Sequence, residues 1–488
     1  MSAVVLLVCA AALGQPAPGA SSEPPPPAIP GVVVSQPLNI FYQPPPEQAG
    51  KKNPPAEQPP AEQPPAEQPA TACAEYAADR PWYSVHAQAT VVSQGNLPFI
   101  SPYIGPNSLP PNGNFQSTNT DTLFLDVRLW QGADFVFNPE VSGGTGLGQT
   151  LGLAGFPNGE ATRVGQLEPT PYIARAIFRQ RFDLDGEWEK VEDAPNQIAG
   201  VQGKNRFTIS IGKMSAEDVF DDNVYSHDPR TSFLSWALMY TGAWDYPANT
   251  RGYNYGIVLD YTNMFYAVRY GIFGEPSTAN GPVIDHDFLK AHGQILEFEQ
   301  DFILGDNPAH LREFGYLNTA HMGQYRQSLQ ETPVDPDITA TRNYRNKYGF
   351  GLSYDLEFSP DLGFFARAGW NDGQTESWAF TEIDQTAALG FLLKGTAWGR
   401  KQDQVGLAGV INGLSDAHKD YLAAGGVGFI IGDGALKYGP EEILETFYDW
   451  DLHKGINVTF DFQGVNNPAY NEDRGPVAIF GVRLHLEY

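Results

Sequence analysis

Apolar and polar residues alternate with a period of two along most of the chain after residue 80. In residues 120–130, leucine or valine occupies positions 123, 125, 127 and 129, whereas Asp126 and Arg128 fall on the opposite face. The same alternation returns at residues 206–211, 347–358, 456–463 and 480–488. A period of two is typical of β-strands with one polar and one apolar face. The pattern therefore predicts an all-β, antiparallel fold.

Three features favour a transmembrane β-barrel over a soluble sheet, which would alternate in the same way. The apolar face is rich in Tyr and Phe near the segment ends, as in the interfacial girdles of membrane barrels. The chain also ends on an alternating strand with a final aromatic residue, Tyr488, which resembles the C-terminal signal of outer-membrane barrels. Finally, the connections fall into two classes, which in such barrels are short periplasmic turns and long extracellular loops. The short ones are at 131–132, 262–263, 359–361 and 453–455, and the long Gly/Pro/Asn-rich ones at 94–119, 142–168, 314–342 and 417–441.

Counting strand-like segments gives fifteen to seventeen, which predicts a barrel of about sixteen strands over residues 80–488. Lipid offers no partner for an open sheet edge, so the sheet must close. A barrel of this size has a lumen too wide for side chains to fill, which predicts a water-filled interior. The alternative is a secreted β-sandwich or propeller, but the sequence shows no internal blade repeat.

The first 80 residues have a different composition. Residues 1–19 contain an apolar run that resembles a secretory signal peptide, although no basic residue precedes it and the true start could lie elsewhere. A buried N-terminal helix and a lipoprotein anchor at Cys9 are the alternatives. Residues 20–79 are rich in proline and repeat Pro-Pro-Ala-Glu-Gln three times, which predicts a disordered, extended linker.

Composition excludes several functional classes. The chain carries 30 Lys+Arg against 57 Asp+Glu, a formal net charge of −27, so it lacks the basic surface that nucleic-acid binding requires. Its two cysteines exclude a disulfide scaffold, and no Cys/His spacing suits zinc. No cofactor is predicted.

Several segments resemble the sequence motifs of one known family, and they occur in the same order along the chain. Residues 152–162 read Gly-Leu-Ala-Gly-Phe-Pro-Asn-Gly-Glu-Ala-Thr, and related segments occur at 218–230, 242–248, 365–373, 425–426, 432–434, 467–471, 474–476 and 483–485. These segments are similar to those of OprB-family carbohydrate-selective porins, and the resemblance covers roughly residues 82–488 without the Pro-rich arm.

The resemblance implies a sixteen-stranded barrel in the outer membrane of a Gram-negative-type bacterium. It implies passive diffusion of monosaccharides such as glucose into the periplasm, without ATP or covalent chemistry. Two alternatives remain open: a general, cation-leaning porin, and a non-conducting surface or adhesion barrel. An outer-membrane hydrolase is disfavoured because no nucleophile motif is present. Expected partners are monosaccharides and other small hydrophilic solutes, outer-membrane lipid and the barrel-assembly machinery, with either a monomer or a homotrimer as the assembly.

A sugar-selective passage needs charged donors and acceptors for hydroxyls and aromatic faces for the ring. The alternation places a set of such side chains on the lumen face, where they could contact sugars. The alternative interpretation is that the same charges form ion pairs that brace the wall. Arg175 and Arg179 are the strongest candidates, because arginines facing water are seldom needed for stability. The predicted pore-lining set is Asp126, Arg128, Trp130, Asp134, Glu140, Arg175, Arg179, Arg269, Glu297, Glu299 and Arg367, with Arg181 and Asp301 beside it.

Two segments fall outside the alternation and are predicted to be inward-folded loops that narrow the pore. The constriction candidates are Phe156, Asn158 and Glu160 in the first, and Asp221, Asp222 and Asn223 in the second. Asp218, Asp221 and Asp222 also offer oxygen ligands for Ca²⁺. Their spacing matches no EF-hand loop, so capping and turn hydrogen bonds are the favoured interpretation.

Overall fold

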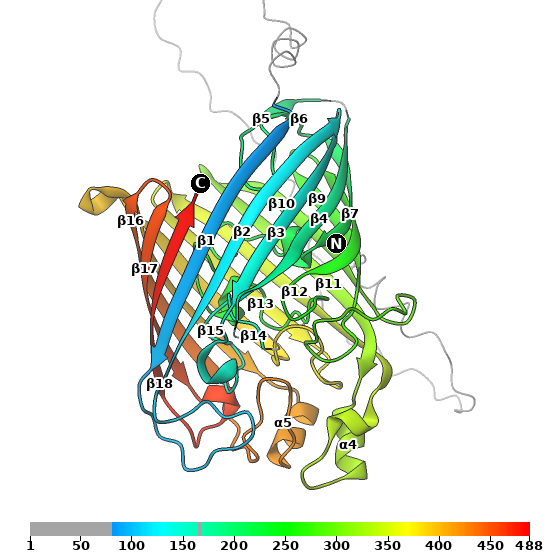
Figure 1. Cartoon of the computed structure of the whole chain (residues 1–488), viewed down its shortest axis with the longest axis vertical. Helices are drawn as coiled ribbons and strands as arrows, with labels where there is room; N and C mark the ends of the chain where they lie inside the picture. Colours follow the sequence, from blue (N-terminus) through cyan, green and yellow to red (C-terminus); the bar gives the residue numbers. More distant parts are fainter. Residues whose placement is uncertain (1–80, 164–167, 185) are drawn as a thin grey trace, which may run out of the picture. The chain divides into compact units, whose positions relative to one another are not determined.

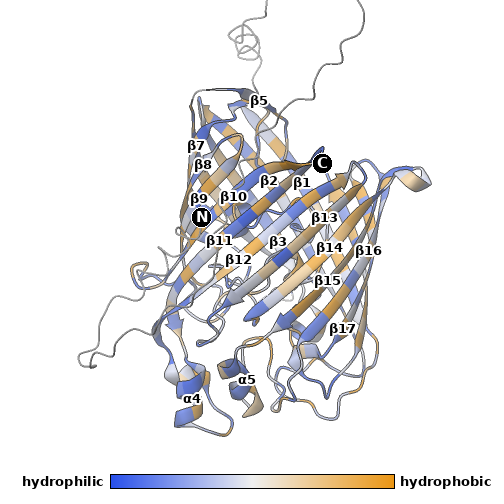
Figure 2. Ribbon diagram, turned by 180° about the vertical axis from the view of Figure 1, so that it is seen from behind, coloured by the Kyte–Doolittle hydropathy of each residue, from blue (hydrophilic) through white to orange (hydrophobic). Residues whose placement is uncertain are grey.

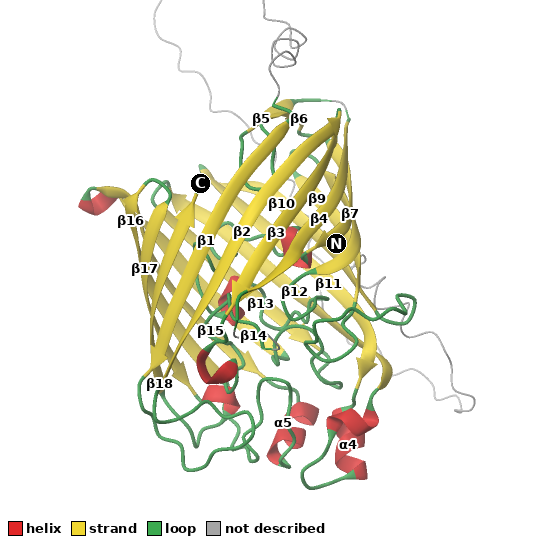
Figure 3. Ribbon diagram, in the orientation of Figure 1, coloured by secondary structure: helices red, strands yellow, loops and turns green. Residues whose placement is uncertain are grey.

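A computed structural model describes residues 81–163, 168–184 and 186–488. The predicted signal peptide (1–19) and Pro-rich linker (20–79) lie outside the described residues. Within the described residues, sixteen strands form one closed antiparallel barrel, so the predicted fold class is confirmed (Figures 1 and 3). Each strand of the barrel pairs with the barrel strands that precede and follow it in the chain, and β1 closes the sheet against β18.

The barrel strands are β1 (Tyr83–Asn96), β2 (Asn114–Trp130), β3 (Ala133–Gly143), β4 (Thr170–Asp183), β7 (Arg206–Met214), β8 (Asn254–Thr262), β9 (Tyr266–Gly274), β10 (His292–Leu304), β11 (Asn307–Met322), β12 (Asn343–Ser359), β13 (Leu362–Asn371), β14 (Gln385–Gly395), β15 (Arg400–Gly413), β16 (Glu441–His453), β17 (Ile456–Asn466) and β18 (Val477–Glu487). Between β4 and β7, a separate hairpin pairs β5 (Trp188–Val191) with β6 (Gly200–Gly203). The connections carry α3 (Trp236–Met239), α4 (Tyr325–Glu331) and α5 (Asp416–Ala423), and short 3-10 turns η1 (Leu147–Gln149), η2 (Ala216–Asp218), η3 (Ile338–Thr341), η4 (Thr396–Trp398) and η5 (Pro468–Tyr470). None of the described helices is both long and apolar enough to cross a bilayer.

The short connections lie at one end of the barrel, called here the turn end, and the long ones at the other, called the loop end. The exception is the β4–β7 connection (184–205), which is long but lies at the turn end. In Figure 1 the β5–β6 hairpin marks the turn end, and α4 and α5 mark the loop end. The β2–β3 turn shows why such turns are tight. Gly132 has a φ of +77°, and a Cβ there would lie 2.3 Å from the carbonyl oxygen of Arg181, so only glycine fits without strain.

Three of the four predicted long connections are shorter than expected, because strands continue into them. They span residues 97–113, 144–169 and 323–342 instead of 94–119, 142–168 and 314–342, and the fourth spans 414–440 instead of 417–441. The largest error is in β11, where Phe314 and Tyr316 are buried in the barrel interior. Their side chains break the expected rule of polar residues inward, so the alternation in this strand could not be recognised.

Side chains alternate between the two surfaces of the sheet as the pattern requires. On β18, Leu484 is 39% exposed on the outer surface, whereas its neighbours Arg483 and His485 are buried inside. Figure 2 shows the resulting orange and blue bands along the strands. The outer surface is therefore apolar and fits lipid.

The interior is not simply filled with water, which corrects the sequence-based expectation. The connections 144–163, 215–253 and 372–384 contribute a buried apolar cluster together with inward-facing wall residues. Among its largest fully buried members are Phe156, Phe220 and Trp244 from these connections. Folded-in loops therefore occupy part of the lumen together with wall side chains, and a cavity between them forms the candidate site.

Candidate functional site

Carboxylates on the barrel wall hold the inward-folded loops by accepting hydrogen bonds from backbone N–H groups. Glu441 on β16 accepts from the amides of Ala154 and Gly155 at 3.0 and 2.6 Å. Further along the same face of β16, Glu445 accepts from the amides of Leu234 and Ser235 at 2.5 and 3.0 Å. All of these groups are buried or nearly so, where leaving one without a hydrogen-bond partner costs about 1–3 kcal/mol.

A second set of contacts fixes the connection 215–253 against β13. The Asp221 carboxylate accepts from Arg367 Nε at 2.9 Å and from the Thr241 amide at 2.6 Å. Both side chains of the Asp221–Arg367 pair are fully buried. Arg367 also donates to the carbonyl of Leu238 at 2.8 Å, so it acts as a bracket for the loop.

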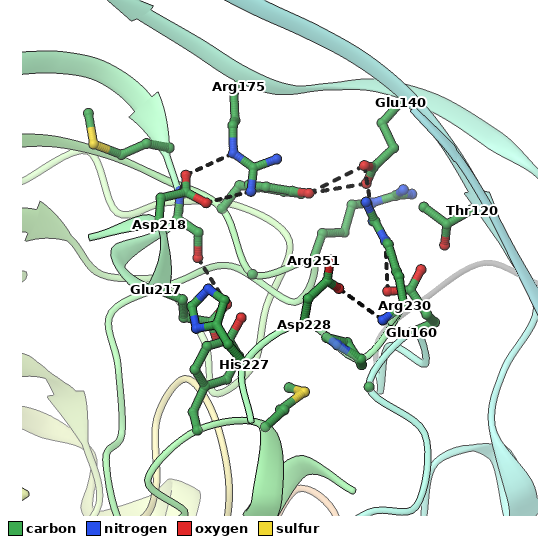
Figure 4. Close-up of a pocket in the computed structure, with 18 of the residues that line it drawn as sticks. Thr120, Glu140, Glu160, Arg175, Glu217, Asp218, His227, Asp228, Arg230 and Arg251 are labelled. Atoms are coloured by element: carbon green, nitrogen blue, oxygen red, sulfur yellow. Dashed lines mark hydrogen bonds and ion pairs between the residues drawn. The ribbon is translucent and has the colours of Figure 1, made fainter. Parts of the chain in front are cut away.

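Between this connection and the wall formed by β1–β4 and β7 lies a cavity of about 710 Å³. Figure 4 shows arginines and carboxylates projecting into it from both sides. Arg175 on β4 donates to Asp218 through Nε and a second guanidinium nitrogen, at 2.8 and 2.5 Å. Arg230 bridges Glu160 at 3.0 Å and Glu140 at 3.2 Å, which links two loops to β3.

Burial and neighbouring charges have opposite effects on the pKa values of Arg230 and Glu160, which lie on these loops. Burial opposes the charge on Arg230, but Glu160 and Glu140 outweigh it and hold the pKa of Arg230 well above its usual value. For the Glu160 carboxyl, burial dominates over the attraction of Arg230 and raises the pKa. The cluster therefore keeps its positive charges firmly.

Arg251 differs from the other cavity arginines. Its guanidinium carbon lies 3.9 Å from the ring centroid of Tyr172, and it donates to the Ser142 hydroxyl at 2.9 Å. It forms no salt bridge with any described acidic side chain. Because a stacked guanidinium keeps in-plane N–H donors, Arg251 can offer hydrogen bonds to a solute.

Four aromatic rings from the connections 215–253 and 372–384 pack against one another. Tyr246 and Phe380 have ring centroids 4.6 Å apart, Trp236 and Phe380 5.6 Å, and Tyr240 and Tyr246 6.1 Å. All four rings line the cavity. The site thus combines charged hydrogen-bonding groups with a run of aromatic faces.

Three of the eleven predicted pore-lining residues reach this cavity, namely Glu140, Arg175 and Arg179. The two arginines do not face water alone, as the sequence-based argument assumed: Arg179 pairs with Asp134 at 3.0 Å and Asp126 at 3.4 Å. Those two carboxylates lie inside the barrel without lining the cavity.

Further along the interior, arginines hold the β4–β7 connection at the turn end. Arg128 donates to the carbonyl of Ala199 at 3.1 Å, and Arg179 donates to that of Asn196 at 3.0 Å. Arg181 pairs with Asp183 at 2.8 Å and also contacts this connection. These side chains thus join the wall to the connection that carries the β5–β6 hairpin.

The remaining charged candidates form a separate cluster beneath the 215–253 connection. Arg269 on β9 pairs with Asp260, Glu297 and Glu299, and Glu297 accepts from the Asp221 amide at 2.8 Å. Asp301 lies at its margin, 3.8 Å from His310. Neither this cluster nor the bracket Arg367 lines the cavity, because the loop covers them.

The placement of Trp130 in the lumen is wrong. A register shift between Arg128 and Trp130 ends the alternation of β2 just before the turn. The indole is 56% exposed, lies 5.9 Å from the Phe178 ring, and donates to Gln180 at 2.8 Å. Phe178 pairs in register with the exposed outer residues Phe135 and Ile211, so Trp130 belongs to the outer surface.

The predicted constriction residues lie on segments that fold into the barrel. Phe156 is fully buried in the apolar cluster, and Asn158 is buried and donates to Thr118 at 3.1 Å. Asn223 is also buried and donates to Ser353 at 3.1 Å. Only Glu160 and Asp222 of the six candidates line the cavity itself.

The three aspartates considered for calcium do not share a site. Asp218 binds Arg175, Asp221 binds Arg367, and the Asp222 side chain is 65% exposed beside His227. Asp218 also accepts from the Ser215 amide at 2.9 Å, which is the capping role that the sequence favoured. Within the described residues, no group of three or more acidic, His or Cys side chains is arranged to hold a metal.

Several cavity residues were absent from the sequence-based set. Arg230, Arg251, Glu217 and the aromatic rings at 236, 240 and 246 sit in the long connection 215–253, where no periodicity reports which way a side chain points. Arg230 lies in a segment that resembled the porin family, which was the one signal available.

Comparison with known proteins identifies the family. Residues 113–488 match the family described as carbohydrate-selective porin, OprB family. No curated protein sequence matches the chain. Among solved structures, Pseudomonas putida OprB at high pH is 14% identical and has a TM-score of 0.64, with 86% of this chain and 96% of that chain covered. The low-pH structure of the same protein is 11% identical, with a TM-score of 0.44 and 86% and 95% coverage. DcaP of Acinetobacter baumannii is 10% identical, with a TM-score of 0.43 and 83% and 97% coverage.

At 14% identity, the likeness to P. putida OprB shows the fold and not the solute. The family match covers more than three quarters of the chain, includes every barrel strand except β1, and agrees with the closed sixteen-strand barrel. The chain belongs to the OprB family of carbohydrate-selective porins and is a bacterial outer-membrane channel.

Proposed function

We propose that this channel gives passive, carbohydrate-selective diffusion of monosaccharides such as glucose into the periplasm. The observation that carries the proposal is the cavity lining, which combines Arg175, Arg230 and Arg251 with a group of aromatic rings. Guanidinium and carboxylate groups exchange hydrogen bonds with hydroxyls, while an aromatic face can contact the apolar side of a sugar ring. The volume of the cavity, about 710 Å³, lies within the ~300–1,000 Å³ typical of small-molecule sites.

The charge of the cavity supports a second candidate, a general porin that prefers cations. Seven carboxyl side chains line the cavity against four arginines. Rings of carboxylates favour cation passage in channels. The two candidates differ in what they predict for a neutral sugar, because only the first requires discrimination between uncharged solutes of equal size.

Liposome swelling with the purified full-length chain separates the candidates. We expect faster swelling in glucose than in an amino acid of similar size, and slow swelling in a disaccharide. The informative variant is Arg251→Gln, because Arg251 has no acidic partner among the described residues and its loss leaves no buried charge unpaired. Its matched control is Arg326→Gln on α4, whose side chain is 56% exposed outside the cavity.

Arg251→Gln should reduce the glucose-to-amino-acid ratio, whereas Arg326→Gln should leave it unchanged. Equal swelling in glucose and the amino acid for the natural chain would favour the general porin. A folded barrel that produces no swelling would favour the non-conducting surface or adhesion barrel.

A further inference from the structure

One carboxyl in the cavity is unlike the rest. Glu217, in the η2 turn, lines the cavity but is only 8% exposed. The other deeply buried cavity carboxylates, Glu140 and Glu160, both bind Arg230. No described Lys, Arg or His forms a salt bridge with Glu217, and its neighbours are Ser215, Tyr240, Tyr246 and Asp218.

The contacts around Glu217 are all with neutral hydroxyls or with another acid. The Ser215 hydroxyl donates to one of its oxygens at 3.2 Å, and the phenols of Tyr240 and Tyr246 are also hydrogen-bonding neighbours of the carboxyl. Asp218 is the adjacent charge, and its carboxylate forms an ion pair with Arg175. A buried carboxyl without a cation is far more stable when protonated.

We propose that Glu217 is a solute-binding residue that offers hydroxyl-bearing solutes an uncharged carboxyl, which can both donate and accept hydrogen bonds. This inference rests on the proposed sugar channel and names a residue that would set its preference. A protonated carboxyl matches a sugar hydroxyl, which is likewise a donor and an acceptor. An ionised carboxylate only accepts, and it would attract cations into the passage.

The electrostatics of the site agree with this assignment. Burial is the main cause that raises the pKa of Glu217 to about 8, and the Tyr246 phenol lowers it less than burial raises it. The Asp218 charge adds to the increase. At pH 7 the carboxyl is therefore mostly neutral, and above pH 9 it is mostly ionised.

The test is the ion selectivity of the full-length channel in planar bilayers between pH 7 and pH 9.5. A unit charge acting on an ion ~7 Å away across water changes its energy by about one RT, so we expect the cation-to-anion permeability ratio to rise by about threefold or more. Other titrating groups, the histidines included, are the same in the natural chain and in Glu217→Gln, so the difference between the two isolates Glu217. Glu217→Gln should remove most of the rise, because the amide does not titrate.

The matched control is Asp222→Asn, which removes an exposed cavity carboxylate and should retain the rise. In parallel, glucose-driven swelling is measured at pH 7 and pH 9.5. We expect the natural chain to lose glucose preference at the higher pH, and Glu217→Gln to keep its preference at both.

A rise of equal size in Glu217→Gln and the natural chain would overturn the inference, even if glucose still passes selectively. Absence of glucose selectivity at every pH, together with a selectivity rise that depends on Glu217, would instead reject the proposed function and leave the charge assignment standing. Glu217→Ala gives a further check: it should lower glucose preference at pH 7 more than Glu217→Gln does, because alanine provides neither donor nor acceptor.

Discussion

The Asp221–Arg367 bracket gives a sharp test of how the loop is held inside the barrel. Asp221 and Asp222 are adjacent in the chain, yet one side chain is fully buried and the other is 65% exposed. Asp221 has a φ of +56°, in the left-handed region that asparagine tolerates. Replacing each by asparagine therefore removes one charge without adding backbone strain.

The expected cost follows from the contacts. Removing one partner of a buried ion pair typically costs about 3–5 kcal/mol, because the other charge is left without compensation. In Asp221→Asn the new amide oxygen could still accept from Arg367, which places this variant near 3 kcal/mol, at the lower end of that ~3–5 range. For Asp222→Asn, the exposed position predicts a change of about 0–1 kcal/mol.

Because this pair joins the 215–253 connection to β13, the loss should appear first as loop opening and not as barrel unfolding. A change of about 3 kcal/mol raises the population of an opened loop by about 100-fold. Amide hydrogen exchange of residues 215–253 in reconstituted protein measures this directly, and larger, noisier single-channel conductance should accompany it. Equal protection of that segment in Asp221→Asn and Asp222→Asn would refute the bracket.

The sequence was sufficient to predict the barrel, because the strand period is a property of the backbone. Whatever residues alternate, positions two apart lie on the same face, and lipid outside makes the outer face uniformly apolar. The prediction failed where that uniformity ends. At Trp130 a register shift reverses the facing, and in β11 the inward residues Phe314 and Tyr316 are apolar because they pack against folded-in loops.

The site was only partly predictable for a related reason. The alternation along a strand identifies which charged side chains point into the barrel, but it does not show whether a loop covers them. Glu297 and Arg367 were therefore assigned correctly to the interior and incorrectly to the open passage. Equally, the arginines that line the cavity include Arg230 and Arg251, which lie on a loop. Their positions depend on wall carboxylates such as Glu445, whose backbone contacts join residues more than 200 positions apart.

Two further predictions test the outer surface and the loop end. Leu484→Arg places a charge on the lipid-facing surface of β18, which costs ~2–4 kcal/mol near mid-bilayer, so the yield of folded barrel should fall, whereas Val334→Arg in an exposed loop should have no effect. Normal assembly of Leu484→Arg would contradict the facing of β18. At the loop end, burial disfavours the ionised form of Asp384, but the buried His418 outweighs it and lowers the pKa below its usual value of 3.8. A pKa lower in the folded than in the unfolded chain means that ionised Asp384 stabilises the fold above about pH 4, and that this contribution is lost as acidification protonates it. Asp384→Asn should therefore be less stable than the natural chain at pH 7, and the gap in the free energy of unfolding should narrow toward pH 3. A gap of constant size across that range would show that Asp384 contributes through its shape and hydrogen bonds and not through its charge.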